Sequence, residues 1–349
     1  MAELLQLLRP HLQKLVPYSS ARDEFSGEAA VFLDANENPL GSATLENYNR
    51  YPDPYQYRVK RMLAKIKCVE QEQTFLGNGS DEAIDLLIRA FCEPGQDHII
   101  ILPPTYGMYK VSADINNVEV RELLLSSDFQ PRVEAILEAA NAQSKILFIC
   151  SPNNPTANLQ NPEAVRLLLQ SFPGLVVVDE AYIDFARVNS WTEKLEEFPN
   201  LVVLQTFSKA WGLAALRLGI AMASPEIIAI LNKIKPPYNI NELTQERALN
   251  AMRNFDKMEM HVKLILHERE RLVKALEDLA LVEKVYPSDA NFVLLKVKGA
   301  RQVYEYLVKQ GIIVRDRSKV ALCEDCLRIT VGTPEENDLL LEQLALYSA

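Results

Sequence analysis

The sequence predicts an α/β protein with a mainly parallel sheet wrapped by helices and a smaller α+β domain. Between about residues 80 and 235, short runs rich in Val, Ile and Leu alternate with helical patterns. The runs lack the polar alternation of a strand with one solvated face, so both faces are expected to be covered. Beyond residue 240 the pattern changes to a long, charged helical stretch and then shorter strands. This change predicts a second domain.

The elements follow in order along the chain. The predicted strands of the large sheet are 98–102, 118–123, 145–150, 175–179, 201–206 and 218–222, with helices at 81–92, 131–140 and 162–170 among them. The later region predicts a helix or helix pair over 241–279, strands at 291–295, 312–314 and 327–330, and helices near 300–310 and 334–347. We expect a large domain of residues 36–240. The small domain is then discontinuous, formed by 1–35 and 241–349, and 1–17 is an amphipathic helix.

Composition excludes several classes of protein. The 349 residues include 37 basic and 47 acidic side chains, a net charge of −10, which argues against a nucleic-acid partner. We find no apolar stretch near the ~18 residues that span a bilayer, and Glu3 precedes any cation at the N-terminus, unlike a signal peptide. We therefore expect no membrane segment.

Cysteine usage favours a reducing compartment. Five cysteines, an odd number, indicate free thiols and a cytoplasmic protein. Cys323 and Cys326 form a C-x-x-C, but no second pair accompanies it and the four histidines show no ligand spacing. We interpret these two as surface or half-buried thiols and expect no metal site.

Polar and aromatic residues follow the predicted strands at the edge where such sheets bind ligands. These segments are 103–106, 151–156, 179–182 and 207–209. A further candidate is the turn 77–82, which opens a helix whose N-terminus could hold an anion. It is not a dinucleotide fingerprint, because Glu82 replaces the third glycine, and taken alone this turn favours Ser80 as a plain helix N-cap.

Three charged residues are ambiguous when taken singly. Asp179 ends an apolar strand and could cap a loop or pair with a protonated ring nitrogen. Lys209 could be a solvated surface lysine or, in a partly desolvated pocket, could condense with a carbonyl group. Arg217 stands at the edge of a strand, where a charge is out of place.

Together these residues resemble the class I/II aminotransferases, pyridoxal-phosphate enzymes of fold type I, over essentially the whole chain. The shared motifs are Asn154-Pro155-Thr156, 179–182, 208–213 and 217–219. Within that family the chain is most similar to histidinol-phosphate aminotransferases, through segments 16–18, 33–39, 50–54, 311–315 and 327–332. Two departures are Ala157, where the family usually has glycine, and Ala215, which replaces another common glycine.

The resemblance implies a role for each matching residue around pyridoxal 5'-phosphate. Lys209 would hold the cofactor covalently and move the proton, and Asp179 would pair with the ring N–H. Asn154 and Tyr182 would hydrogen-bond the phenolate oxygen, with Tyr106 stacked on the ring. The cofactor phosphate would rest on Gly79, Ser80 and Asp81, with Ser208 and Arg217 adding hydrogen bonds and charge.

It also implies a homodimer with shared active sites and a pair of small-molecule substrates. Tyr51 would reach the cofactor phosphate of the partner subunit, and Arg328 would bind the glutamate α-carboxylate. Tyr18, Asn36 and Arg315 would recognise the second substrate, although Arg315 could instead pair with Asp316 on a surface turn. The expected exchange is between L-glutamate/2-oxoglutarate and imidazole-acetol phosphate/L-histidinol phosphate. A threonine-phosphate decarboxylase, a broad aromatic aminotransferase and, least favoured, a non-catalytic regulatory module remain alternatives.

Overall fold

The computed structural model describes residues 6–18 and 30–347, and its centre is a seven-stranded sheet. The strands are β1 (Thr74–Asn78), β2 (His98–Ile101), β3 (Glu119–Glu122), β4 (Ser144–Cys150), β5 (Leu175–Asp179), β6 (Leu201–Thr206) and β7 (Leu218–Ala223). Their order is β1-β7-β6-β5-β4-β2-β3. Parallel pairing joins β3, β2, β4, β5 and β6, in that order. Strand β7 is antiparallel to both β6 and β1. The predicted fold class is confirmed, and within this sheet the sequence analysis missed β1.

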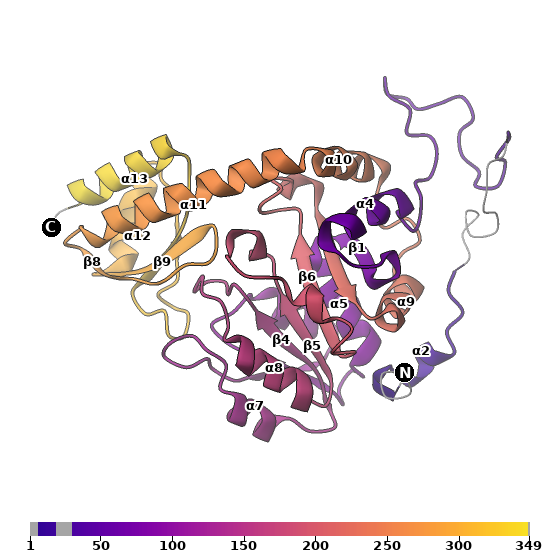
Figure 1. Ribbon diagram of the computed structural model, residues 1–349, viewed down its shortest axis with the longest axis horizontal. Coiled ribbons are helices and arrows are strands. Elements are labelled where there is room, and N and C mark those ends of the chain that lie inside the picture. The colour runs from indigo at the N-terminus through magenta and orange to yellow at the C-terminus, as the bar shows by residue number, and fades with distance from the viewer. Residues whose placement is uncertain (1–5, 19–29, 348–349) are drawn as a thin grey trace.

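Both faces of the sheet are buried, as the unbroken apolar runs predict. In β4, Leu147 and Ile149 pack on one side, and Ile146 and Phe148 on the other. The first side is covered by α4 (Tyr57–Lys67), α7 (Val133–Ala139) and α8 (Pro162–Ser171). The second is covered by α5 (Ser80–Phe91), α6 (Met108–Ile115) and α9 (Pro225–Ile234). The sheet is therefore the middle of three layers, visible in Figure 1.

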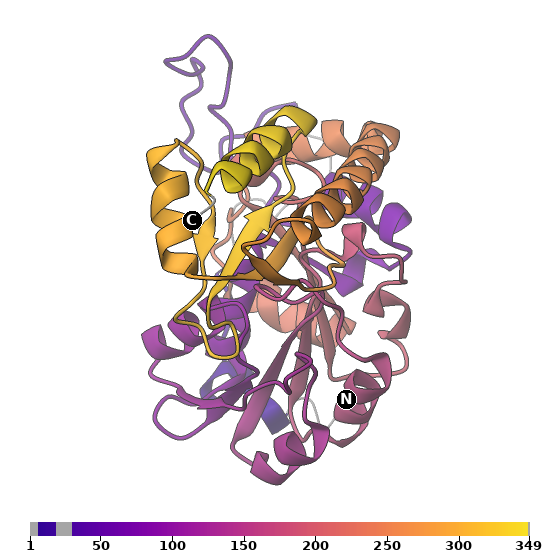
Figure 2. The ribbon, with the colours of Figure 1, turned by 90° about the vertical axis from the view of Figure 1, so that its left-hand side faces the viewer.

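A second, four-stranded antiparallel sheet lies over one side of the first (Figure 2). Its order is β10-β11-β9-β8. The elements are α10 (Glu242–Arg253), α11 (Phe255–Glu277), β8 (Val282–Val285), β9 (Phe292–Val297), α12 (Ala300–Lys309), β10 (Arg315–Asp316), β11 (Cys326–Thr330) and α13 (Pro334–Leu346). One face packs against α11, α12 and α13, while Phe292 and Leu294 on the other face join the core of the large sheet. The two units are therefore packed together.

The boundary between the two units differs from the one that the sequence favours. Leu8 is buried against the large unit, Arg9 pairs with Glu93 at 3.2 Å, and Lys233 Nζ donates to the Leu12 carbonyl at 2.8 Å. The described N-terminal residues, including α2 (Pro10–Gln13), thus contact α5 and α9, not the small domain, because Leu8 finds its apolar partners there. Helix α10 also contacts α4. We propose that the boundary lies within α11, further along the chain than residue 240, where the sequence predicts it.

Residues 30–48 form an arm that projects away from the rest of the chain. Figures 1 and 2 show it as an indigo loop beyond α4. Its apolar side chains have little packing: Leu33 is 88%, Leu40 94% and Leu45 102% exposed. Large apolar side chains exposed in a group mark an interaction surface rather than a free loop.

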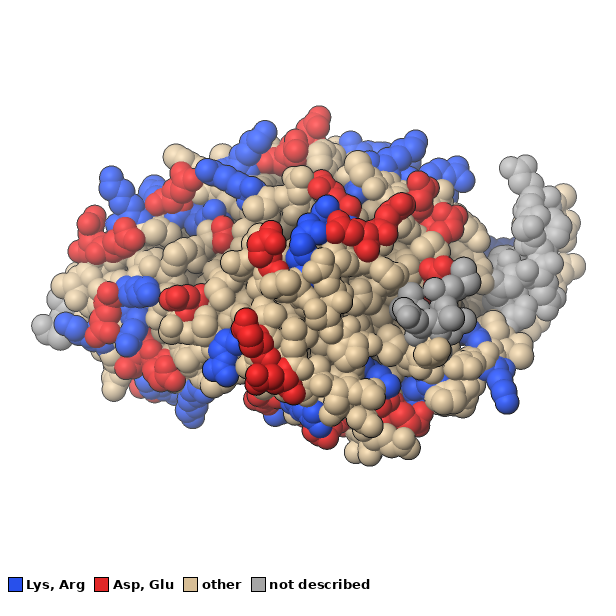
Figure 3. Space-filling view, turned by 60° about the horizontal axis from the view of Figure 1, so that its bottom comes forward, with Lys and Arg blue, Asp and Glu red and all other residues tan. Residues whose placement is uncertain are grey.

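The surface and the cysteines complete the description. Acidic and basic side chains intersperse on the face drawn in Figure 3. No helix among the described residues is long and apolar enough to cross a membrane, and none of their His, Cys, Asp and Glu side chains form a group suited to a metal ion. The expectation that Cys323 and Cys326 are surface or half-buried was wrong, since both are buried in the core beneath the small sheet.

Candidate active site

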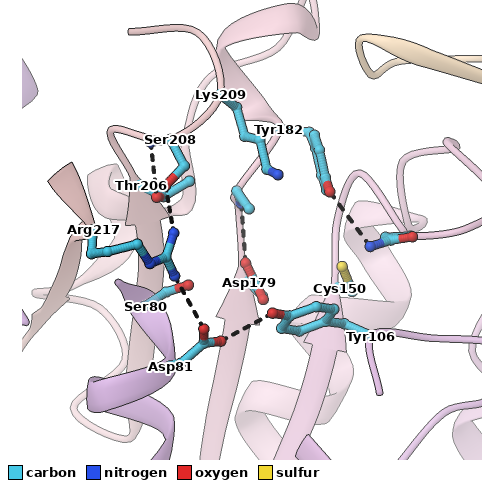
Figure 4. A pocket seen from close by; sticks show the side chains of 12 residues that line it. Ser80, Asp81, Tyr106, Cys150, Asp179, Tyr182, Thr206, Ser208, Lys209 and Arg217 are labelled. Carbon is cyan, nitrogen blue, oxygen red and sulfur yellow. Dashed lines mark hydrogen bonds and ion pairs between the residues drawn. The ribbon is translucent and has the colours of Figure 1, made fainter. Parts of the chain in front are cut away.

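A pocket opens at the carboxyl ends of β4, β5 and β6, facing the N-terminus of α5 (Figure 4). It lies where a parallel sheet ordinarily binds its ligand. Its lining residues are Ser80, Asp81, Tyr106, Cys150, Asn154, Asp179, Ala181, Tyr182, Thr206, Ser208, Lys209 and Arg217. Nine of these were predicted as cofactor residues, and the fold brings all nine together.

Asp179 is a buried carboxylate at the end of β5, only 2% exposed. The Tyr109 hydroxyl donates to its Oδ2 at 2.7 Å, and the Ala181 N–H donates to its Oδ1 at 3.1 Å. Burial raises the pKa of Asp179 to about 6, although these two hydrogen bonds oppose the rise. Both donors are neutral, so a cationic partner in the pocket would stabilise this carboxylate.

Lys209 enters the pocket from the loop that follows β6, opposite Asp179 in Figure 4. Its Nζ lies 5.6 Å from the centre of the Tyr182 ring. Partial burial lowers the pKa of Lys209, and the positive charges of Arg328 and Arg217 lower it further. A lysine with a lowered pKa presents more of its neutral amine, the form that reacts with a carbonyl carbon.

A chain of polar contacts joins the large sheet to the small one above the pocket. Asn154 Nδ2 donates to the Tyr182 hydroxyl at 3.4 Å, and Arg328 Nη1 donates to Asn154 Oδ1 at 2.5 Å. Burial raises the pKa of Tyr182, so its hydroxyl stays protonated and can donate to an anionic oxygen. The guanidinium of Arg328 also lies 5.2 Å from the centre of the Phe292 ring.

The other end of the pocket is suited to an anion. Helix α5 starts after Gly79, which has a φ of 74°, and no side chain caps its free N–H groups. Ser80 is therefore not the N-cap that the sequence left as an alternative. The Arg217 guanidinium is packed against Gly79, where an added Cβ would meet Nη2 at 2.7 Å. Arg217 Nη1 also donates to Ser208 Oγ at 3.4 Å. Glycine leaves room for these groups to meet one ligand.

Asp81 and Tyr106 form the floor between the two ends. The Tyr106 hydroxyl donates to Asp81 Oδ1 at 3.0 Å, and Arg217 Nη2 contacts Asp81 Oδ2 at 3.4 Å. Burial and the neighbouring Asp81 carboxylate raise the pKa of Tyr106. The ring of Tyr106 is thereby held beside the space between Asp179 and Lys209, as Figure 4 shows.

Six predicted residues do not line this pocket: Gly79 and Arg328 adjoin it, as described above, and the other four lie apart from it in the described chain. Tyr51 stacks on Tyr238 with ring centres 4.5 Å apart, and Asn36 lines the same hollow. Tyr18 is 75% exposed beside Pro54 and Tyr55.

Arg315 is the fourth residue, and it is exposed on β10, directly opposite Arg328. Asp316 contacts Arg301 at 3.5 Å, so the structure shows no Arg315–Asp316 pair.

Two features of the site, Tyr109 and Arg317, were not found from the sequence, whereas Ala157 was noted there as a departure from the family. Tyr109 holds Asp179, but as a buried tyrosine within a helical pattern it gives no distinguishing signal. The Arg317 N–H donates to the Cys326 carbonyl at 2.8 Å, and its position two residues after Arg315 could have placed it on the same strand face. Ala157 adopts a φ of 69°, the region that favours glycine, so the turn keeps that conformation at a cost of about 1–2 kcal/mol.

Comparison with known proteins decides the family. The model of the family "Aminotransferase class I and II" matches residues 28–344. The chain belongs to this family. A histidinol-phosphate aminotransferase of Cytophaga hutchinsonii is 56% identical, covering 98% of each chain. Another, of Flavobacterium johnsoniae, is 54% identical and also covers 98% of each.

Solved structures share the architecture of this aminotransferase. A histidinol-phosphate aminotransferase from Sinorhizobium meliloti, in complex with pyridoxal-5'-phosphate, superposes with a TM-score of 0.79 at 23% identity. The match covers 97% of this chain and 96% of that one. At this identity the likeness concerns the fold, and it confirms the predicted fold type.

Proposed function

We propose that this aminotransferase exchanges an amino group between L-glutamate and imidazole-acetol phosphate, yielding 2-oxoglutarate and L-histidinol phosphate in histidine biosynthesis. The observation that carries the proposal is the 56% identity, over 98% of both chains, to a histidinol-phosphate aminotransferase. The pocket has the side chains that such a reaction requires. The five free cysteines support a reducing, cytoplasmic location.

Pyridoxal 5'-phosphate is the cofactor of this family, and the pocket fits it. The uncapped α5 N-terminus with Arg217 and Ser208 suits the phosphate, and Lys209 is placed to react with the aldehyde. Asp179, whose hydrogen-bond donors are both neutral, suits a protonated ring nitrogen. When bound, the cofactor supplies a carbon that carries the amino group and a ring that withdraws electrons from it.

The chain's own residues then hold and move protons. Asp179 would keep a proton on the ring nitrogen by pairing with it, held in place by Tyr109. Asn154 and Tyr182, which are hydrogen-bonded to each other, would donate to the phenolate oxygen. Lys209 Nζ, once free, would take the proton from the substrate Cα and return it to the cofactor carbon, since its lowered pKa leaves more of the neutral amine to accept a proton.

Substrate binding would use the small sheet. Arg328 is held over the pocket by Asn154, and its planar guanidinium can bind a carboxylate or a phosphate with two hydrogen bonds. It could therefore hold both substrates in turn, although one presents an α-carboxylate and the other a phosphate ester. Arg315, opposite Arg328 on β10, would add charge for the phosphate.

The arm supports a homodimer with shared sites. Residues 30–48 carry exposed leucines, and Tyr51 and Asn36 line a hollow outside the chain's own pocket. A second copy would bury these leucines and place Tyr51 against the partner's cofactor phosphate. Tyr18 and Asn36 remain candidates for substrate binding in such a dimer.

Single-turnover absorbance of the holoenzyme tests the proposed reaction. Mixing with L-histidinol phosphate should convert the cofactor band within one turnover, and 2-oxoglutarate should restore it. O-phosphothreonine and aromatic amino acids serve as competitors. Conversion by O-phosphothreonine with no response to histidinol phosphate would overturn the proposal and favour the decarboxylase.

A further inference from the structure

Three arginines share one face of the small sheet beside the pocket. Arg315 lies directly opposite Arg328 in the antiparallel pair β10–β11, and the Arg317 N–H donates to the Cys326 carbonyl at 2.8 Å. Residues 315 and 317, like 326 and 328, therefore project from the same side. Cys326 and Leu294, which is opposite Arg328, belong to the core that continues into the large sheet, so this face is the one turned toward Tyr182.

This arrangement has a cost unless an anion binds there. Like charges directly opposite each other destabilise a strand pair. Among the described residues, none of the three arginines forms an ion pair, and the nearby Asp316 is engaged by Arg301 and by the Ser318 N–H at 2.9 Å. Burial lowers the pKa of Arg328, and the charge of Arg317 adds to that effect. The repulsion is unrelieved within the described chain.

Arg317 is the least expected of the three. Its Nε is buried and has no hydrogen-bond partner among the described residues. The backbone pairing with β11 places its side chain on the same face of the small sheet as Arg328, whose Nη1 donates to Asn154 above the pocket. A buried guanidinium N–H without a partner is costly, because this donor has left water and gained nothing in exchange.

We propose that Arg317 is a specificity-determining residue that binds the phosphate ester of the substrate together with Arg328. This inference rests on the proposed function and deepens it, since it adds Arg317 to the arginines proposed there to bind the phosphate. A phosphate monoester carries a charge near −2 and three acceptor oxygens, whereas a carboxylate carries −1 and two oxygens. Arg328 alone satisfies the carboxylate, and a second guanidinium matches the additional charge and oxygen.

Two half-reactions of the holoenzyme test this assignment. In Arg317→Gln, the half-saturating concentration of L-histidinol phosphate should rise about tenfold or more, because a charged hydrogen bond is lost. The rate at saturation and the half-saturation by L-glutamate should change less than about threefold. Arg317→Lys keeps the charge but not the planar guanidinium. Its half-saturating concentration of L-histidinol phosphate should lie between those of the wild type and Arg317→Gln. Arg187→Gln, an exposed arginine that pairs with Glu270, is the matched control and should change the half-saturation by neither substrate.

Inorganic phosphate gives a readout that does not depend on the substrate's identity. It should compete with L-glutamate in the wild-type holoenzyme, and Arg317→Gln should weaken this inhibition about tenfold. The role of Arg317 would be overturned if Arg317→Gln raised the half-saturating concentrations of both substrates equally, or if it left inhibition by phosphate unchanged. A wild-type enzyme that responds to glutamate and phosphate but not to histidinol phosphate would instead overturn the proposed function alone.

Discussion

The pocket and the arm differ in how many of their side chains find packing or hydrogen-bond partners within one chain. In the pocket, Asp179 is held by Tyr109 and Ala181, and Asn154 is held by Arg328, so the side chains are fixed before any ligand arrives. In the arm, Leu33 and Leu40 are 88% and 94% exposed. Preorganised groups at a reaction centre accelerate chemistry, whereas exposed leucines stabilise only what covers them. The comparison indicates a site that one chain builds and a second chain completes.

The largest expected effect concerns the pocket. Lys209→Ala should lower single-turnover transamination at least about 10³-fold, because the covalent anchor and the proton carrier are both lost. The melting temperature should stay near that of the wild type, since Lys209 is exposed at its loop. Borohydride reduction of the wild type followed by peptide mapping should find the cofactor on Lys209. Labelling at another lysine would assign the pocket a different role, and Lys309→Ala on α12 is the control.

Substitutions in the arm should weaken the assembly of the dimer. Leu33→Ser with Leu40→Ser should weaken the dimer at least about 10²-fold, since burial of each leucine contributes about 1.5–3 kcal/mol. Sedimentation equilibrium measures this change. Leu167→Ser with Leu339→Ser removes two leucines that are each 49% exposed on α8 and α13, and it should leave the dimer intact. Equal effects of the two pairs would show that the arm is not an interface.

A substitution at Arg328 tests whether the pocket of one chain binds the anionic groups of both substrates at the same place. Arg328→Lys should weaken both half-reactions about 10- to 150-fold, because lysine cannot make the two parallel hydrogen bonds of a guanidinium. Half-saturating concentrations of L-glutamate and L-histidinol phosphate provide the measurement. A loss confined to one substrate would mean that the two anions bind at separate places.

A smaller effect tests the cost of the preformed pocket. Burial raises the pKa of Asp179 to about 6, above the 3.8 expected of an exposed aspartate. Between these pH values the folded apoenzyme keeps a proton that the unfolded chain has lost, so the free energy of unfolding falls as the pH rises. Asp179→Asn should remove this fall. The free energy of unfolding of the variant, relative to that of the wild type, should therefore be about 1–3 kcal/mol higher at pH 7 than at pH 4.

Urea unfolding of the apoenzyme at several pH values measures that difference. Asp128→Asn, an exposed carboxylate, is the control. An unchanged pH slope in Asp179→Asn would show that Asp179 is not held as a costly buried charge. Glu180, whose pKa burial raises to about 7, contributes a similar slope at slightly higher pH and should persist in the variant.

Much of the fold was predictable because its pattern is local. The apolar runs located the strands from β2 to β7, and their loops contributed the pocket residues. Long-range packing was not predictable: Leu8 packs against the large unit, and Cys323 and Cys326 are buried by the contact between the two sheets. Arg317 was missed because its neighbours come together only when β10 and β11 pair. The arm's exposed leucines likewise have no meaning until the rest of the chain is placed.

Mixed dimers measure most directly whether a second chain completes the site. Hybrids of one Lys209→Ala chain and one Tyr51→Phe chain, purified by two different tags, are assayed at limiting cofactor. If Tyr51 serves the partner, each hybrid holds one site with both changes and one intact site. The account then predicts about half of the wild-type activity, well above either homodimeric variant. Activity equal to half of the Tyr51→Phe homodimer would place Tyr51 in its own chain's site and contradict the account.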